Sequence, residues 1–258
     1  MLLPHEPAPF EVVRPEGSSR VLLVCDHASK RIPEALGSLG VSEADRATHI
    51  GWDIGAALVA RHMSELLDAT LILAGYSRLA FDCNRPPHVT SAMPAVSGGI
   101  PIPGNEGLDE ASKLAREEAL FRPYHEAISR ILDDRMGDPQ REPPVLLSIH
   151  SFTPELLGQK RPWPVAVLYG RDVRLAHAFR DALARDPKLL VGDNEPYHVT
   201  DLTDYTLPIH GEARHLLHTA FEIRQDGLLD EPSAHAWAER LVGIWRELEP
   251  KLAQPPFA

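Results

Sequence analysis

Hydrophobic residues along the chain fall into short apolar runs that alternate with segments of helical spacing. The compact apolar runs, which predict buried strands, cover residues 20–26, 70–74, 144–149, 165–169 and 218–223. Segments with apolar residues three and four positions apart, which predict helices, cover residues 54–67, 108–136, 173–185 and 233–248. This alternation predicts an α/β fold of three layers, in which a mixed, mostly parallel central sheet is flanked by helices.

Proline and glycine predict where some of these elements end or break. A strand is predicted over residues 77–83 and should stop at the Asn-Arg-Pro-Pro run that follows, because proline cannot donate to a ladder. Pro123 should kink or split the long helix. Residues 88–107 are rich in Pro, Gly and Ser, and we expect this irregular segment to form the border or lid of an active site.

Two later segments are harder to assign. Residues 194–205 are polar and predict a loop. Residues 207–217 have spacing compatible with a helix, but Pro208 and Gly211 weaken that prediction. The length of 258 residues fits one domain over residues 1–258.

Charge and composition indicate which kinds of partner the protein can bind. The formal net charge is −11, and the basic residues are scattered, which argues against a nucleic-acid partner. No apolar run approaches the roughly 18 residues of a membrane helix, and the N-terminus lacks the pattern of a signal peptide. With only Cys25 and Cys83, no disulfide framework is implied. We therefore expect a cytoplasmic enzyme that acts on a small molecule.

Polar residues gather where the predicted strands end. The clusters are Asp26-His27, Asp82-Cys83-Asn84-Arg85, Ser148-Ile149-His150-Ser151 and Phe221-Glu222-Ile223-Arg224. In open α/β sheets, ligands bind outside the carboxyl ends of the strands, so these clusters could converge in space.

His27 and His150 are the first candidates for metal ligands. They are far apart in the sequence, and a histidine satisfied by a backbone carbonyl is the simpler interpretation of either one alone. Catalytic zinc usually takes three His and carboxylate ligands and keeps one position open for water. Iron or cobalt can occupy a site of the same composition, so the sequence predicts one divalent ion, with zinc preferred.

Longer motifs resemble a known family. Leu147-Ser148-Ile149-His150-Ser151-Phe152 and Phe221-Glu222-Ile223-Arg224 look like the last zinc ligand and the general-base glutamate of zinc carboxypeptidases, and Asn84-Arg85 resembles their carboxylate-binding pair. A more specific resemblance is to the N-formylglutamate amidohydrolase family, and it is found in residues 25–33, 51–55, 76–86 and 205–214. This likeness extends in order from about residue 20 to about residue 225 and implies a fold like that of the zinc peptidases.

The resemblance implies a set of metal ligands. His27 and His150 take two ligand positions, but Lys30 stands where the carboxypeptidase pattern has a ligand glutamate. Asp53, in Gly-Trp-Asp-Ile-Gly, is the preferred third ligand; its alternative role is to cap the following helix. Asp26 is its rival, although adjacent residues of a strand point to opposite faces.

The resemblance also assigns roles around the metal. Glu222 would be the general base, because a lone carboxylate between apolar residues is costly to bury; the alternative is an ion pair with Arg224. Arg78, with Asn84 and Arg85, would grip the substrate carboxylate, and Arg78 would also stabilise the oxyanion. A surface salt bridge is the alternative for Arg78.

His210 and Arg214, four residues apart, would share one face of a helix and would stabilise the oxyanion or bind a second carboxylate of the substrate; the alternative is a surface polar pair. The implied reaction is zinc-dependent hydrolysis of an N-acyl amino acid, such as N-formyl-L-glutamate to formate and glutamate. A zinc carboxypeptidase or another deacylase is the alternative enzyme. The alternative of a different class is an amino-acid-binding protein without metal.

Overall fold

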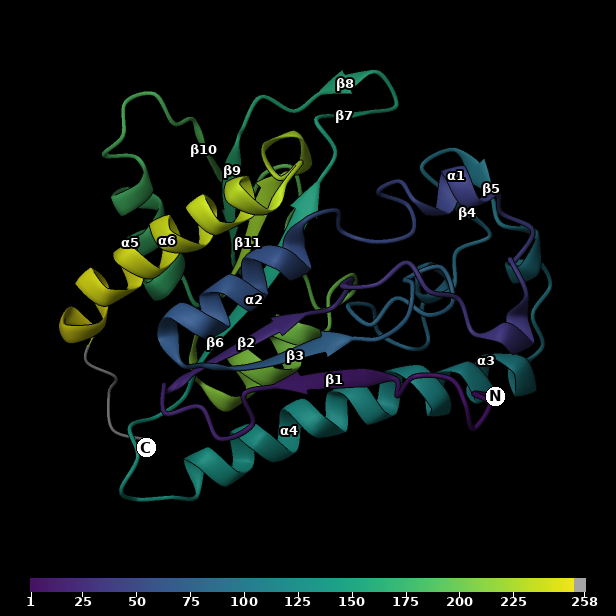
Figure 1. Cartoon of the computed structure of the whole chain (residues 1–258), viewed down its shortest axis with the longest axis horizontal. Coiled ribbons are helices and arrows are strands. Elements are labelled where there is room, and N and C mark those ends of the chain that lie inside the picture. The colour runs from purple at the N-terminus through teal and green to yellow at the C-terminus, as the bar shows by residue number, and fades with distance from the viewer. Residues whose placement is uncertain (253–258) are drawn as a thin grey trace.

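A seven-stranded sheet forms the centre of the computed structural model, which describes residues 1–252 (Figure 1). Residues 253–258 of the expected domain lie outside the described residues. The strand order is β1-β3-β2-β6-β11-β9-β10. The strands are β1 Phe10–Val13, β2 Val21–Cys25, β3 Thr70–Ala74, β6 Val145–Phe152, β9 Val165–Leu168, β10 Val191–Asp193 and β11 Leu217–Arg224. The pairs β1–β3 and β9–β11 are antiparallel and the others are parallel, so the sheet is mixed and mostly parallel.

Helices and short turns complete the described chain. The α-helices are α1 Glu43–Arg46, α2 Ala56–Leu67, α3 Glu110–Arg116, α4 Arg122–Met136, α5 Arg174–Leu183 and α6 Glu231–Leu248. Two ribbons pair β4 Val96–Ser97 with β5 Ile100–Pro101 and β7 Glu155–Leu156 with β8 Gln159–Lys160. The 3-10 turns are Glu34–Leu36, Thr90–Ala92, Pro103–Asn105, Glu212–Arg214, Gln225–Gly227 and Glu249–Lys251, and the π-helical turns are Glu117–Phe121 and Leu207–Gly211.

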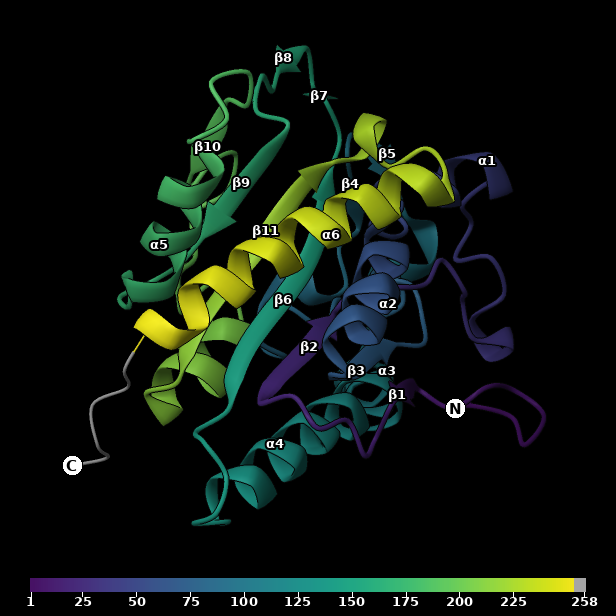
Figure 2. The same ribbon diagram turned by 60° about the vertical axis from the view of Figure 1, so that its left-hand side comes forward.

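Helices cover both faces of the sheet, which makes the three layers that the sequence predicts (Figures 1 and 2). Helices α2, α5 and α6 pack on one face, where Leu23, Leu147 and Phe221 belong to the larger apolar core. Helix α4 covers the other face, where Leu22 and Leu146 belong to a second core. The inner strands are buried on both faces, which explains their continuous apolar runs.

Most predicted elements are confirmed. The helix considered over residues 207–217 is instead a π-helical turn followed by a 3-10 turn, and α1 and the ribbons β4–β5 and β7–β8 were not predicted. Other differences concern the sheet and the long helix. Residues 77–83 form a turn instead of a strand, because Ser77 bonds locally and the chain bends before Asp82. The long predicted helix is split: α3 ends at Arg116, and a π-helical turn leads into α4, which has Pro123 in its first turn. Strands β1 and β10 were not predicted; both are short and lie at the edges of the sheet.

None of the helices in residues 1–252 is long and apolar enough to cross a membrane.

Candidate metal centre and active site

Three neighbouring strands bring the main candidate residues to one edge of the sheet. Strands β2, β6 and β11 are parallel neighbours, so their carboxyl ends lie together. His27 follows β2, His150 lies in β6, and Glu222 in β11 stands directly opposite His150 in the register. Because side chains alternate along a strand, the apolar neighbours Ile149 and Phe221 face the larger core, whereas His150 and Glu222 face the other side of the sheet.

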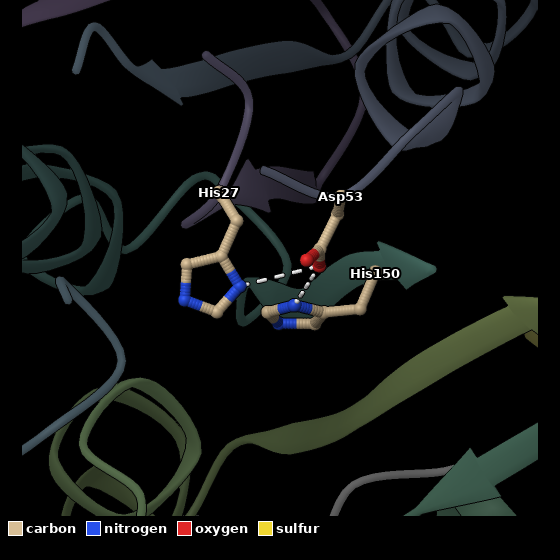
Figure 3. Close-up of side chains that lie close together, drawn as sticks. All are labelled: His27, Asp53 and His150. Atoms are coloured by element: carbon tan, nitrogen blue, oxygen red, sulfur yellow. Dashed lines mark hydrogen bonds and ion pairs between the residues drawn. The ribbon is translucent and has the colours of Figure 1, made fainter. Parts of the chain in front are cut away.

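His27, Asp53 and His150 form a compact group of potential metal ligands (Figure 3). One ligand atom from each side chain lies within 4.8 Å of the other two. Asp53 Oδ2 is 3.2 Å from His27 Nδ1 and 2.8 Å from His150 Nδ1. All three side chains are buried, with 3 to 4% of their surface exposed. The structure therefore brings together the three residues that the sequence proposes as metal ligands.

Local backbone contacts place Asp53 in this group. The Asp53 N–H donates to the carbonyl of His27 at 3.0 Å, which fixes the two segments to each other. Gly55 has a φ of 80° and precedes α2 as its N-cap; a side chain there would be strained and would meet Leu228. Asp53 therefore does not cap α2 with its side chain, which instead accepts a bond from the Ser151 N–H at 3.3 Å.

Each histidine of the group also contacts a second carboxylate. Asp82 Oδ1 lies 2.7 Å from His27 Nε2, and Asp26 Oδ2 lies 3.2 Å from His150 Nε2. A carboxylate only accepts, so each ring nitrogen that faces one carries a proton in the metal-free protein. The two Nδ1 atoms face the same Asp53 oxygen, where a cation can replace their protons, whereas the Nε2 protons stay because each faces a separate acid. The Nδ1 atoms of His27 and His150 are then the ones that can take a cation, and outer carboxylates of this kind fix the rings of metal-bound histidines.

Asp26 has four neighbours and is buried, with 1% of its surface exposed. Tyr124 and Thr206 donate their hydroxyl protons to Oδ1 at 2.9 and 2.8 Å, and Ser148 donates to Oδ2 at 3.2 Å. His150 completes the set. Within the described residues, Asp26 thus lies behind His150 and outside the group that Asp53 forms.

The carboxylates around His27 and His150 favour a positive charge on these two rings. Burial opposes protonation of His150, but its hydrogen bonds to Asp26 and Asp53 raise its pKa well above the ordinary value. Burial and the charge of Arg78 likewise oppose protonation of His27, and the carboxylates of Asp82 and Asp53 still raise its pKa.

The two histidines in turn favour the charged form of Asp53. Burial alone would raise the pKa of Asp53, but the charges and hydrogen bonds of His27 and His150 lower it. Two imidazoles and one carboxylate are the ligand types that zinc takes in catalytic sites. The residues present therefore fit a divalent cation.

Glu222 is a buried carboxylate with an unsatisfied oxygen. Its Oε2 has no hydrogen-bond partner within residues 1–252, and only 6% of the residue is exposed. Burial, with the negative charge of Asp53, raises its pKa to about 7, although His150, His27 and Arg78 act in the opposite direction. Arg224 does not neutralise it, because that guanidinium bonds to Asp226 instead. An unsatisfied buried carboxylate beside such a group is typical of a catalytic acid or base.

A cavity of about 350 Å³ lies over these residues. Its lining includes His27, Asp53, His150, Glu222 and Arg78, and a loop of residues 196–206 supplies much of the opposite wall. None of residues 88–107 lines this cavity, so the expectation that they form its border is wrong; the loop after β10 takes that place.

Arg78 is held against the acids of the site. Its Nε and Nη2 donate to Asp82 Oδ2 at 3.1 and 2.7 Å, and Nη1 lies 3.5 Å from Asp53 Oδ1. Burial would lower the pKa of Arg78, but Asp82 and Asp53 raise it. Arg78 is therefore not the surface salt bridge that was its alternative.

Asn84 and Arg85 line the cavity but already have partners within the protein. The Asn84 Oδ1 accepts from the N–H groups of Tyr205 and Thr206 at 3.2 and 3.1 Å. Arg85 donates to the carbonyl of Thr203 and lies 3.8 Å from Asp82. Both residues thus hold the loop that forms the cavity wall, and their predicted role as a carboxylate clamp stays a prediction.

His210 and Arg214 do not line this cavity. His210 stacks on His125, and their ring atoms Nε2 and Nδ1 are 2.9 Å apart. Arg214 donates to Asp133 at 2.9 Å and lies 3.4 Å from His210 Nδ1, so the two residues are neighbours as the sequence predicts. The structure does not bring them to the proposed metal ligands, and their predicted contact with substrate stays a prediction.

The cavity also contains a residue that the sequence did not single out. Tyr197, in the polar loop, contributes to the wall, and behind it lies Arg161. A lone aromatic residue in a loop carries no chemical pattern, so only the folded structure relates Tyr197 to Glu222.

Comparisons with known proteins agree with this fold. A family model described as N-formylglutamate amidohydrolase matches residues 19–229. The crystal structure of gene product Atu2144 from Agrobacterium tumefaciens is similar at 38% identity, with a TM-score of 0.92, over 97% of this chain and 98% of that chain. The N-formylglutamate amidohydrolase from Ralstonia eutropha JMP134 shares the fold at 19% identity, with a TM-score of 0.65, over 95% of this chain and 98% of that chain.

A metallo-carboxypeptidase from Pseudomonas aeruginosa aligns at 14% identity with a TM-score of 0.45, over 95% of this chain and 61% of that chain, which is too distant to carry an argument. The comparison with curated proteins found no match. The family match covers most of the chain and includes all the residues of the candidate site. The chain therefore belongs to the N-formylglutamate amidohydrolase family, a family of hydrolases.

Proposed function

We infer that this protein is a metal-dependent amidohydrolase that cleaves the linear amide of an N-acyl amino acid, with N-formyl-L-glutamate as the substrate that its family suggests. The observation that carries the proposal is the buried, unsatisfied carboxylate of Glu222 next to the group of His27, Asp53 and His150. In this arrangement a base and a cation site share one cavity.

The proposed cation site uses the Nδ1 atoms of His27 and His150 and the carboxylate of Asp53. When bound there, a zinc ion would supply Lewis acidity and make water acidic near neutral pH. Asp82 and Asp26 would hold the two imidazole rings from behind through their Nε2 protons.

Glu222 would move the proton during hydrolysis. Its carboxylate would take a proton from water as the water oxygen attacks the carbonyl carbon, and would then give that proton to the nitrogen as the C–N bond breaks. In the metal-free site, burial raises its pKa to about 7, and an acid with a raised pKa is better suited to give the proton back than an ordinary glutamate. Formate, or another acid, and the free amino acid would leave.

Arg78 would stabilise the negative charge that develops on the carbonyl oxygen. Its guanidinium is fixed by Asp82 and reaches Asp53, so its positive charge is already in place before reaction. Fixed donors of this kind contribute about 3–4 kcal/mol to transition-state stabilisation.

A substrate panel on metal-defined protein tests the proposal. We expect zinc-loaded protein to release formate from N-formyl-L-glutamate faster than it cleaves N-acetyl-L-glutamate or a dipeptide. Glu222→Gln should bind zinc as the wild type does and lose nearly all turnover. Preferred cleavage of the dipeptide would make the protein a carboxypeptidase, and full turnover by Glu222→Gln would remove Glu222 from its role.

A further inference from the structure

A buried arginine without an acidic partner lies directly behind the wall of the catalytic cavity. Arg161 is only 9% exposed, and no carboxylate of residues 1–252 lies within ion-pair distance of its guanidinium. Its side chain donates from Nη1 to the hydroxyl of Tyr197 at 2.9 Å and packs against the rings of Tyr197 and Phe152. Burying a charge is costly, and among the described residues only two aromatic rings and one hydroxyl, with no acid, compensate this one.

The backbone fixes Arg161 in this position. Its N–H donates to the carbonyl of Pro154 at 2.9 Å, and its own carbonyl accepts from Arg224 Nη1 at 3.0 Å. The guanidinium lies 4.9 Å from the centre of the Tyr197 ring, so the arginine both stacks on the ring and bonds to its hydroxyl. Arg161 therefore contacts both the ring and the hydroxyl of Tyr197.

The phenol of Tyr197, which belongs to the cavity wall, has a proton that no described residue accepts. It lines the cavity together with Glu222 and Arg78. Since Arg161 donates to the phenol oxygen, the phenol proton remains available, and no acceptor for it is found among the described residues. Although 40% of the residue is exposed, burial of its phenol end and the charge of Glu222 raise the pKa of Tyr197, so the phenol stays protonated at neutral pH.

The two arginines that line the cavity already have acidic neighbours. Arg78 is bonded to Asp82 and Asp53, and Arg85 lies near Asp82 and bonds to the carbonyl of Thr203. Arg161 differs from both because no acid contacts it. An anionic substrate in the cavity would therefore meet a positive charge that no acid neutralises only near Tyr197, behind which the guanidinium of Arg161 lies.

We propose that Tyr197 binds a carboxylate of the amino-acid part of the substrate, with Arg161 behind it as the positioning residue that orients the phenol and supplies the compensating charge. This inference rests on the proposed function and deepens it by assigning the carboxylate-binding group to a pair outside the Asn84–Arg85 motif. A substrate lacking that carboxylate should lose the contact.

The test compares variants on charged and neutral substrates. For N-formyl-L-glutamate we expect Tyr197→Phe and Arg161→Gln to raise KM by about tenfold or more and to change kcat little, because the contact is present in the ground state as well as in the transition state. Arg161→Lys, which keeps the charge but not the planar fork, should recover part of the loss.

Two neutral analogues locate the carboxylate: N-formyl-L-glutamine lacks the side-chain charge, and the α-amide of N-formyl-L-glutamate lacks the other one. The wild type should prefer N-formyl-L-glutamate to at least one of them, and Tyr197→Phe and Arg161→Gln should lose that preference. Preference retained against both analogues would overturn the proposal.

The matched controls are Tyr169→Phe and Arg240→Gln. The Tyr169 hydroxyl bonds to Asp193 outside the cavity, and Arg240, on helix α6, stacks on Trp237 and pairs with Asp186. Both should behave as the wild type does. Tyr197→Phe removes one oxygen from a side chain that is 40% exposed, so it should fold even if Arg161→Gln does not.

Calorimetric binding of L-glutamate separates this proposal from the proposed function. If the zinc-loaded wild type cleaves no N-formyl amino acid but binds L-glutamate, with an affinity that falls about tenfold in Tyr197→Phe, the reaction is wrong and the carboxylate site stands. If turnover is present and neither binding nor KM depends on Tyr197 and Arg161, the carboxylate site is wrong and the reaction stands.

Discussion

Replacing Glu222 with glutamine should stabilise the metal-free protein, and by an amount that depends on pH. The carboxylate is 6% exposed and has an oxygen without a hydrogen-bond partner in the described chain, so ionising it in place is unfavourable. Glutamine has nearly the same shape and no charge. The substitution therefore removes the cost of the charge and leaves the surrounding packing almost unchanged.

The size of this effect follows from the pKa of Glu222. Burial raises it from 4.5 to about 7. At about 1.4 kcal/mol for each pKa unit, the difference corresponds to about 3.5 kcal/mol. Below pH 4.5 the glutamate is protonated in both the folded and the unfolded chain and costs nothing. Between pH 4.5 and 7 the folded protein binds the extra proton, so this residue makes the protein less stable as the pH rises.

Urea unfolding of wild-type and Glu222→Gln protein, both kept metal-free with a chelator, measures this directly. The variant should be about as stable as the wild type near pH 4.5 and about 3.5 kcal/mol more stable above pH 7. Glu65→Gln, at an exposed position on α2, is the control and should show no such trend. A difference between variant and wild type that does not change with pH would refute the reasoning.

Three further substitutions or titrations test other parts of the site. Asp26→Asn should weaken zinc binding about 10–100-fold, because Asp26 supports His150, and competition with a chromophoric chelator measures the dissociation constant; an unchanged constant would remove Asp26 from that role. Arg78→Gln should lower kcat about 100-fold or more in steady-state assays while zinc content stays at the wild-type value, and a normal kcat would exclude the oxyanion role. His125 should stay neutral down to about pH 4, because burial lowers its pKa to about 4; an NMR titration of its ring with a midpoint near 6.5 would contradict this.

The fold was largely predictable because its inner strands are buried on both faces. Such strands appear in the sequence as unbroken apolar runs, and residues 70–74 were assigned with the bounds that the structure shows. Edge strands lack this signal: β1 has one neighbour and partly exposed side chains, so Phe10–Val13 has no continuous apolar run that predicts a strand. Ser77 and Leu79 are equally buried, but they belong to a turn that the apolar pattern cannot distinguish from a strand.

The candidate site was predictable where a residue ends or lies in a buried strand. His27, His150 and Glu222 stood out because polar side chains interrupt apolar runs, and parallel topology then brings the three together. The interactions of Asp82 and Asp26 with the two imidazole rings depend on side-chain geometry and could not be deduced from spacing.

His210 shows the limit of motif reasoning. Its position four residues before Arg214 predicts that the two meet, and they do. The spacing does not tell whether the two side chains point into the cavity or away from it. Burial against His125 turns His210 to the inside of the protein, and His125 donates from Nε2 to the carbonyl of Cys83 at 2.7 Å. His210 and His125 together therefore support the turn that contains Asp82 and Cys83.

Zinc titration of metal-free protein, followed by formate release from N-formyl-L-glutamate, tests the central claim most directly. Activity should rise in proportion to bound zinc and level off at about one zinc per chain, as expected for a single site with three protein ligands. Asp53→Ala should bind less zinc and show correspondingly less activity. Full activity in protein freed of metal, or zinc uptake that does not depend on Asp53, would contradict the account.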